Sequence, residues 1–477
     1  MALRSDTLLL SAGPAFRMTE SLYAVSPLDG RYAGRTAPLS PYASEAGLMR
    51  ARVRVEVEYL IALADTEGID LQLGTQERQQ LRSLYKTFSE EDANIIKKLE
   101  TEGYAGFDAT NHDVKAVEYF IRHELSEDIA HISPWIHFGL TSEDVNNVAH
   151  RLLVRDAMEE VVLPELLSAR NDLTKLAREY RDLPMLARTH GQPATPTTFG
   201  KEMAVYAARL GRAISEVQRA TENLAGKLGG ASGTYAAHVA AYPDIDWRGV
   251  AERFVTGLDL EYVSPTTQVN PCDDLATLFD ALRRANSIIL DLDHDMWLYI
   301  SDRYLGQETT EGETGSSTMP HKVNPIDFEN SEGNLSKANS DLQFLADYIT
   351  TSRLQRDLSD STVKRNIGGA LAHCLIGYTK LQTGLDKVAP NEQVMRDELR
   401  NTPEIIGEAV QTILRREGHE DAYEQVKALT RGERVTIEDF RALFEELDID
   451  DDVEAELKAL SPETYVGIAD RLVDDVE

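Results

Sequence analysis

The chain has 477 residues, of which 42% are hydrophobic and 27% charged, and its formal net charge is −32. This composition is typical of a soluble globular protein with a large core, and the acidic balance argues against nucleic-acid partners, whose phosphates need basic side chains. No apolar run reaches the roughly 18–20 residues of a membrane span, so we expect no membrane association.

The 49 basic residues comprise 14 Lys and 35 Arg. This composition, with few lysines and a large excess of acidic residues, resembles that of proteins from a high-salt cytoplasm. Dissolved salt there screens the acidic side chains and shortens the range of their mutual repulsion. An acidic protein of ordinary salinity is the alternative. If the high-salt interpretation is correct, the unfolding temperature should rise as KCl approaches roughly 1 M, where the Debye length falls to about 3 Å. Full stability in dilute buffer would contradict it.

The N-terminal segment 1–17 contains only a short apolar stretch at residues 8–10. That stretch is too short for the apolar region of a secretion signal, so we expect a cytoplasmic protein. Segment 1–17 is either an N-terminal tail of the protein or the result of a start codon assigned too far upstream. In the second case, translation begins at Met18. The two cysteines, Cys272 and Cys374, lack any metal-ligand spacing, which favours two buried thiols over a disulfide or zinc site.

Helical periodicity dominates the chain, and strand signals are sparse. Two helices are expected at 44–65 and 113–125. Five longer helical segments follow, at 143–180, 198–226, 273–304, 326–352 and 361–386. Pro164 should kink or split the first of these. Helices of about 30 residues span about 45 Å, so the sequence predicts an elongated bundle, and apolar residues on several faces indicate contacts with other subunits.

Four long connections separate the predicted helices and are rich in Gly, Pro, Ser and Thr. They cover residues 184–197, 229–247, 263–272 and 306–325. Long ordered loops tend to carry function. The last 92 residues hold 26 acidic and 11 basic side chains. We therefore predict an all-α protein of three domains: an N-terminal helical domain at 1–131, a central long-helix bundle at 132–385, and an acidic helical domain at 386–477.

The segment 312–330, GETGSSTMPHKVNPIDFEN, places three consecutive hydroxyls, Ser316, Ser317 and Thr318, before Lys322. A glycine- and hydroxyl-rich loop that leads into a rigid basic element suits a lid that carries a reacting group. An ordinary turn with helix-capping serines is the alternative. The familiar nucleotide and zinc motifs GxxxxGK[ST], strand–GxGxxG–helix and HExxH are absent.

A histidine on a stiff turn forms the second candidate site. His190 lies in the segment 187–203, ARTHGQPATPTTFGKEM, between threonines, glycine and two prolines. A histidine held in this way just before a helix is a candidate acid or base. A purely structural histidine is the alternative.

Two further segments have the character of anion sites. Thr141 and Ser142 precede a helical run, and a helix start offers free N–H groups to carboxylate or phosphate. A plain N-cap is the alternative there. Arg353, Arg356 and Arg365 lie near Ser361 and Thr362 and form a candidate phosphate site. Surface ion pairing with neighbouring aspartates is the alternative.

Six segments carry a family resemblance, and one of them, SSTMPHKVNP, by itself resembles the defining loop of the fumarase/aspartase superfamily. They are SPLDGRY (26–32), TNHDVKAVEY (110–119), TSEDVNN (141–147), RTHGQPATPTTFGKEM (188–203), SSTMPHKVNP (316–325) and QRDLSDSTVKRN (355–366). This set resembles the adenylosuccinate lyases of the fumarase/aspartase superfamily, in the bacterial purine-pathway form. The resemblance runs from about residue 26 to the C-terminus and is loosest in the acidic tail.

The resemblance implies a homotetramer with a twenty-helix core, whose active sites combine segments from three subunits. It implies β-elimination of fumarate from adenylosuccinate, giving AMP, and from succinylaminoimidazole-carboxamide ribotide, with no cofactor and no metal. Ser316 would be the general base and His190 the general acid. The implied substrate-binding residues are Arg31, Tyr32, Asn111, His112, Asp113, Thr141, Ser142, Gln268, Ser317, Lys322, Val323, Asn324, Asn330, Arg356, Ser361, Thr362, Val363, Lys364 and Arg365.

Three other functions account for fewer of these residues. A sister lyase acting on argininosuccinate, fumarate or aspartate would not need the arginines of the candidate phosphate site. A serine hydrolase using Ser316 and His190 would lack a G-x-S-x-G elbow and an evident acid partner. A binding protein that kept the fold and lost its activity would not be expected to retain Ser316, His190 and Lys322 together.

Overall fold

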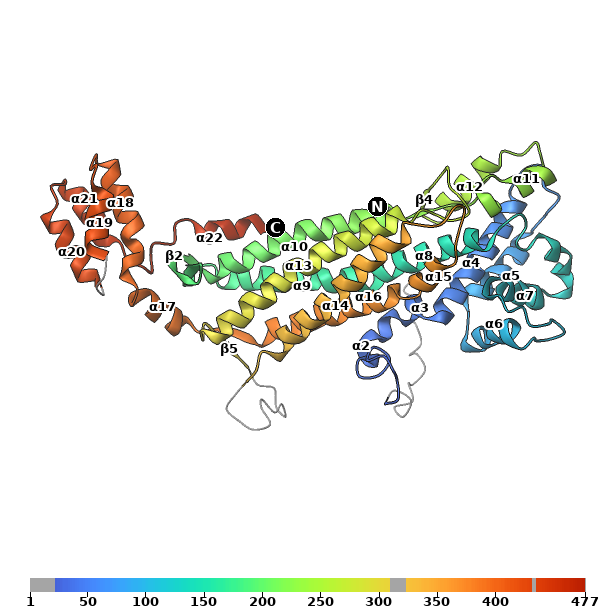
Figure 1. The fold of residues 1–477 in the computed structure, drawn as a ribbon, viewed down its shortest axis with the longest axis horizontal. Coiled ribbons are helices and arrows are strands. Elements are labelled where there is room, and N and C mark those ends of the chain that lie inside the picture. Colours follow the sequence, from blue (N-terminus) through green and yellow to red (C-terminus); the bar gives the residue numbers. More distant parts are fainter. Residues whose placement is uncertain (1–21, 309–322, 431–434, 477) are drawn as a thin grey trace.

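The computed structural model describes residues 22–308, 323–430 and 435–476. It is an elongated molecule with long helices in the middle, N-terminal helices at one end and a small helical unit at the other (Figure 1). Within the described residues, extended structure is limited to three two-stranded sheets and one isolated bridge. The predicted all-α class is confirmed.

The N-terminal end is built from short helices around one buried helix, α4. Its elements are α2 (Ala33–Thr36), η1 (Ala37–Leu39), α3 (Ser40–Ala43), α4 (Glu45–Ala64), α5 (Thr75–Lys86), α6 (Glu90–Thr101), α7 (Asp113–Glu124) and η2 (Glu127–Trp135). Helix α4 begins where Ser44 accepts a hydrogen bond from the backbone N–H of Gly47. This cap satisfies one of the free donors of the first turn. The helices predicted at 44–65 and 113–125 are confirmed as α4 and α7.

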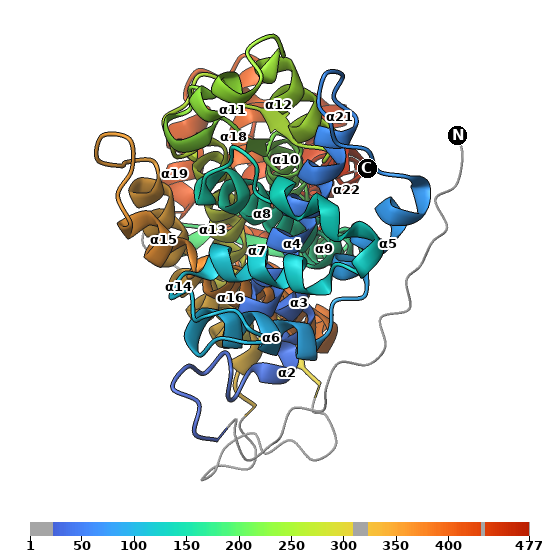
Figure 2. The same ribbon diagram turned by 90° about the vertical axis from the view of Figure 1, so that its right-hand side faces the viewer.

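The centre of the molecule is a bundle of long helices. Its helices are α8 (Ser142–Ala157), η3 (Met158–Val162), α9 (Leu163–Glu179), α10 (Phe199–Glu222), α11 (Ala236–Ala241), α12 (Trp247–Thr256), α13 (Asp273–Ser301), α14 (Ile326–Ile349), α15 (Ser359–Lys364) and α16 (Ile367–Lys387), with η4 (Gly230–Ser232). Seen end-on, α4, α7 and α8 lie at the near end of this bundle (Figure 2). Helix α14 packs against α13 and α16, and α10 against α9 and α13.

Helical spacing of apolar residues builds this bundle. On α10 the side chains of Met203, Ala207, Leu210, Ile214 and Val217 recur every three to four residues, and all are buried. Such a stripe gives one apolar face that packs against neighbouring helices. The long predicted segments therefore became helices because their apolar faces have partners.

Pro164 divides the segment predicted as one helix over 143–180. Helix α8 ends at Ala157, a π-helical turn covers Met158–Val162, and α9 begins at Leu163 with Pro164 in its first turn. The run stays helical, since the Leu163 N–H still bonds to the Met158 carbonyl in the π-helical pattern. The predicted irregularity at Pro164, which has no N–H to donate, therefore takes the form of a π-helical turn between α8 and α9. The segment 361–386 also divides, since α15 and α16 are separate helices.

Two predicted connections contain regular structure. Segment 184–197 was expected to be a loop and is instead an antiparallel hairpin of β1 (Pro184–Thr189) and β2 (Gln192–Thr198). Each strand has only this one partner, so its prolines fall on strand edges, where a missing N–H costs little. Segment 229–247 contains α11. The other strands are β3 (Ala225–Gly226) with β4 (Glu261–Tyr262), and β5 (Leu305–Gln307) with β6 (Val388–Pro390).

The C-terminal part leaves the bundle and returns to it. Its elements are α17 (Glu392–Arg400), η5 (Pro403–Ile406), α18 (Gly407–Arg416), α19 (Ala422–Thr430), α20 (Ile437–Glu446), α21 (Asp451–Ala459), α22 (Ala469–Leu472) and η6 (Val473–Val476). Phe440, Phe444 and Val410 belong to a core of their own, whereas Val473 and Val476 belong to the main core. Only the middle of segment 386–477 therefore packs separately.

Both cysteines are buried and unpaired, as predicted. Burial raises the pKa of the Cys374 thiol to about 11, so this group stays protonated. Among the helices of the described ranges, none combines the length and apolar character that a membrane crossing would require.

Candidate active site

The start of α8 is a meeting point for predicted substrate-binding residues from distant parts of the chain. The Ser142 hydroxyl lies 3.5 Å from Nε2 of His112. His112 is the N-cap of α7, and its Nδ1 accepts a hydrogen bond from the backbone N–H of Lys115. The next residue, Asp113, accepts a hydrogen bond of 3.4 Å from Arg365. Segments around residues 112, 142 and 365 thus form one cluster, here called the α8 cluster.

Arg356 joins the α8 cluster from the segment that follows α14. Its guanidinium donates to the Gln268 side chain at 3.3 Å and forms a 3.1 Å ion pair with Glu143. Lys364 lies 3.9 Å from the same carboxylate and 2.6 Å from Asp360. Three predicted residues, Gln268, Arg356 and Lys364, are therefore held around Glu143, which the sequence analysis did not single out.

Surface ion pairing, the alternative to a phosphate site in this segment, applies to Arg353. Arg353 pairs with Asp357 at 3.4 Å, and its side chain is 81% exposed. The Arg356 side chain is only 19% exposed and points to the buried Glu143. The arginine run therefore divides into a solvated residue and an inward-facing one, which fits a binding site better than a charged surface.

Asp113 is kept ionised in the α8 cluster. Burial alone would raise its pKa, but the charge and hydrogen bond of Arg52, at 2.8 Å, outweigh burial and hold the pKa below its ordinary value. Arg52 is itself buried and also donates to Asn146 at 2.9 Å. The carboxylate of Asp113 thus links two arginines, Arg52 and Arg365, and fixes the position of the guanidinium of Arg365.

Asp144 organises the turn before α8. Its carboxylate accepts hydrogen bonds from the backbone N–H groups of Thr141, Gly229 and Gly230, and from Lys227 at 2.7 Å. Both side chains of the Asp144–Lys227 pair are fully buried. The Thr141 amide is thus already satisfied by Asp144, as the plain N-cap alternative expects. The Ser142 hydroxyl, by contrast, faces His112.

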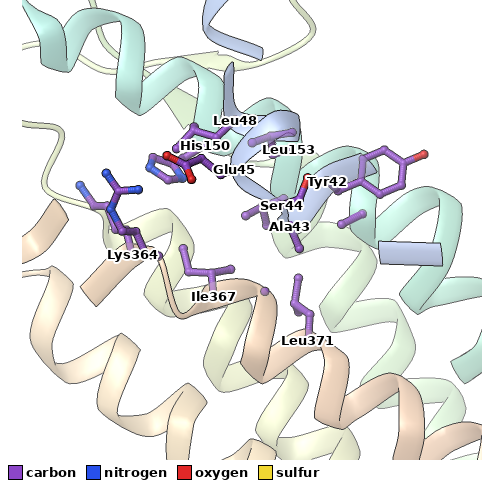
Figure 3. Close-up of a pocket in the computed structure, with 14 residues that line it drawn as sticks. Tyr42, Ala43, Ser44, Glu45, Leu48, His150, Leu153, Lys364, Ile367 and Leu371 are labelled. Carbon is purple, nitrogen blue, oxygen red and sulfur yellow. The ribbon is translucent and has the colours of Figure 1, made fainter. Parts of the chain in front are cut away.

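A cleft of about 210 Å³ is lined in part by Lys364 and Arg365, and Figure 3 shows its lining residues. Residues of α3, α4, α8, α15 and α16 line it, and His150 lies at its polar side. Burial lowers the pKa of His150 well below its ordinary value, and the charge of Lys364 lowers it further, so the imidazole is neutral. The cleft borders the α8 cluster without containing Arg356 or Ser142.

Helix packing places further predicted residues at the same end of the bundle as the α8 cluster. Helix α2 packs against α16, and this brings Arg31 and Tyr32, which directly precede α2, to the same end of the bundle. Asn111 directly precedes His112, with a positive φ of 46°. Ser361, Thr362 and Val363 lie on α15 beside Lys364 and Arg365. The structure thus gathers most of the predicted substrate-binding set at one end.

His190 lies in the β1–β2 hairpin, which is at the other end of the long-helix bundle from α8 (Figure 1). It forms the two-residue turn between β1 and β2 with Gly191, and both have positive φ, 54° and 73°. This is the backbone form that tight hairpins prefer, and glycine adopts it without strain. The His190 side chain is exposed to solvent.

Three other predicted residues lie around the start of α14. The carbonyl of Val323 accepts a 3.1 Å hydrogen bond from Gln307, Asn324 follows it, and Asn330 accepts from Asn334 at 2.9 Å. Ser316, Ser317 and Lys322 fall outside the described residues. His190, Val323, Asn324 and Asn330 together are called the hairpin-end set below.

The long helices keep the hairpin-end set away from the α8 cluster. Helix α13 runs from just after Gln268 to just before β5, and its 29 residues span about 43 Å at 1.5 Å per residue. Helix α14 returns over 24 residues, from just after Asn324 to a few residues before Arg356. One copy of the chain therefore does not bring His190 to Arg356.

Among the residues that the structure describes, no group of three or more His, Cys, Asp or Glu side chains is arranged to hold a metal ion. The α8 cluster instead contains a hydroxyl, an amide and the partly exposed guanidinium groups of Arg356 and Arg365, whereas the Lys364 ammonium is buried beside Asp360 and Glu143. This donor set suits carboxylate and phosphate oxygens.

Comparisons with known proteins identify the family of the chain. The lyase family model matches residues 30–339, and the adenylosuccinate lyase C-terminal model matches residues 352–466. The chain is 46% identical to an adenylosuccinate lyase of Haemophilus influenzae, over 95% of this chain and 98% of the relative. It is 45% identical to that of Escherichia coli K12, over 96% and 99%.

Solved structures extend the likeness to the fold. A fumarate lyase from Mesorhizobium sp. BNC1 superimposes with a TM-score of 0.71 at 20% identity, covering 92% of this chain and 96% of that one. A 3-carboxy-cis,cis-muconate lactonizing enzyme from Pseudomonas putida gives 0.72 at 20% identity, covering 96% and 98%. The long-helix architecture is thus shared well beyond the sequence relatives. By its sequence and its fold, the chain belongs to the adenylosuccinate lyase family.

Proposed function

We propose that the protein releases fumarate from adenylosuccinate, giving AMP, and from succinylaminoimidazole-carboxamide ribotide. The observation that carries this proposal is the α8 cluster, where Arg356, Lys364 and Arg365 lie around the start of α8, which also carries the hydroxyl of Ser142. A nucleoside monophosphate needs cationic side chains of this kind to bind its phosphate. Argininosuccinate, fumarate and aspartate carry no phosphate, so these cations favour the purine substrates.

The reaction is a β-elimination. A base removes a proton from the Cβ atom of the succinyl group, the C–N bond breaks, and an acid donates a proton to the leaving nitrogen. We assign the base to Ser316 and the acid to His190. The intermediate is a dianion, which fixed donors and cations must stabilise. Lys322, Asn324 and backbone N–H groups of the Ser316 segment are assigned to that role.

We further propose that the active site is completed by other copies of the chain in a homotetramer. The hairpin-end set and the α8 cluster lie at opposite ends of α13, and a nucleotide does not bridge about 43 Å. Large apolar side chains on the long helices are also exposed in the single chain: Trp297 and Leu298 on α13 and Phe344 on α14. Such groups fit burial between bundles. The cytoplasmic location stays a prediction.

Fumarate release tests this proposal and can be followed by ultraviolet absorbance. We expect the purified protein to release fumarate from adenylosuccinate and not from argininosuccinate. Release from argininosuccinate alone would assign the site to a sister lyase. Hydrolysis without fumarate would favour a serine hydrolase, and the absence of any turnover would favour a binding protein.

A further inference from the structure

The hairpin that carries His190 is anchored by an ion pair next to the turn. Arg188, two residues before His190 on β1, donates from Nη2 to the carboxylate of Glu398 on α17. Its Nε lies 3.7 Å from Asp302 at the end of α13. A planar guanidinium held by two carboxylates is more restricted in direction than a single surface ion pair. The end of the hairpin is therefore fixed relative to α13 and α17.

The same carboxylate holds a second element. The hydroxyl of the buried Tyr304, between α13 and β5, donates to the other oxygen of Glu398. Burial raises the pKa of Tyr304, and its hydrogen bond to Glu398 raises it further, so the phenol keeps its proton and remains a donor. Glu398 thus joins β1 to the chain that enters β5.

A small apolar contact lies beside this network. Leu186 on β1, Leu399 on α17 and Ile405 on η5 form a buried cluster separate from the main core. The apolar contact holds the hairpin near α17, but it is not directional. The hydrogen bonds of Arg188 and Tyr304 to Glu398 are directional, so they add a fixed orientation to this contact.

We propose that Glu398 is a positioning residue for the general acid: it holds the His190 hairpin, through Arg188, in register with the end of α13. The proposal rests on the proposed function, since it takes His190 as the acid. Glu398 itself touches no substrate in this account. A catalytic group displaced by about 1 Å can cost on the order of 100-fold in rate. Displacing the hairpin should therefore slow the chemical step and leave substrate binding unchanged. The predicted phosphate-binding residues lie at the other end of the bundle, where Glu398 has no influence.

The test compares Glu398→Gln with Glu463→Gln in the full-length protein. Glu463 forms ion pairs with Arg396 and Arg400 of the same helix α17, and the exposure of its side chain is close to that of Glu398, 24% against 28%. A general loosening of α17 would affect both variants. Loss of hairpin position would affect only Glu398→Gln, because Arg188 and Tyr304 both bond to Glu398, whereas the ion-pair partners of Glu463 are Arg396 and Arg400.

For Glu398→Gln we expect kcat to fall about tenfold or more, while KM and the inhibition constant of AMP stay within about twofold. Glu463→Gln should keep both kcat and KM. Tyr304→Phe, which removes one of the two tethers and keeps the ring, should lower kcat less than Glu398→Gln does. An unchanged kcat in Glu398→Gln, or an equal fall in Glu463→Gln, would overturn the proposal.

Hydrogen exchange gives a readout that does not depend on activity. Backbone amides of β1 and β2 should exchange faster in Glu398→Gln than in the wild type, and not in Glu463→Gln. Equal protection in all three proteins would also overturn the proposal. If the wild type releases no fumarate, the proposed function fails. Hydrogen exchange would still decide whether Glu398 holds the hairpin.

Discussion

Replacing His190 by alanine is expected to lower kcat for adenylosuccinate by about 10²–10⁴-fold, the usual contribution of a general acid. The leaving nitrogen departs poorly without a proton, so the C–N bond breaks slowly once the acid is gone. KM should change little, because the predicted phosphate grip around Arg356 is untouched. Steady-state fumarate release under saturating substrate measures both quantities.

The control for this substitution is a histidine with no part in the proposed site. His419 lies in the separate C-terminal unit, after α18, and its backbone N–H donates to Leu414. His419→Ala should leave kcat within about twofold of wild type, as expected for a substitution away from the site. Near-normal turnover in His190→Ala would remove the acid assignment and leave the hairpin a purely structural role.

Ser316→Ala is expected to retain less than a few percent of wild-type turnover, because the base that removes the Cβ proton is lost. A serine is an awkward base, since an alcohol is almost wholly protonated at neutral pH. Backbone N–H groups, the dipole of the following helix and Lys322 could stabilise an alkoxide. Closure of the loop on substrate would exclude water and strengthen these interactions. Ser316 is therefore proposed to become basic only in the closed state.

Two measurements separate this role from a binding role. Substrate affinity of Ser316→Ala, measured by calorimetry, should stay near that of wild type while turnover is lost. Turnover above a few percent would defeat the base assignment. Because Ser316 lies outside the described residues, this prediction rests on the motif and on the chemistry of the reaction.

The helical architecture was predictable because apolar spacing is a local property of the sequence. The buried stripe of α10 and the irregularity at Pro164 can both be read from neighbouring residues. The hairpin at β1 and β2 was missed, although glycine at the second turn position, after His190, is part of the usual signal for a two-residue hairpin turn. Two prolines in β2 masked that signal, because proline argues against a strand unless the strand is an edge.

The candidate site was only partly predictable. His112, Ser142 and Arg365 are far apart in the chain, and no periodicity relates them, so only the family resemblance predicted that they act together. Glu143 and Asp144 were missed because acidic residues in a first helical turn are ordinarily explained by the helix dipole. Their inward direction, towards Arg356 and Lys227, depends on segments that meet α8 only in the folded chain.

Coexpression of two inactive variants, His190→Ala and Arg356→Ala, tests most directly the claim that the site is shared between copies. Each variant alone should be nearly inactive at low substrate concentration. In mixed oligomers, a site that takes His190 from one copy and Arg356 from another is intact in roughly a quarter of cases, so fumarate release should recover to about that fraction of wild type. Mixed oligomers as inactive as either variant alone would show that both residues come from the same chain, and would contradict the account.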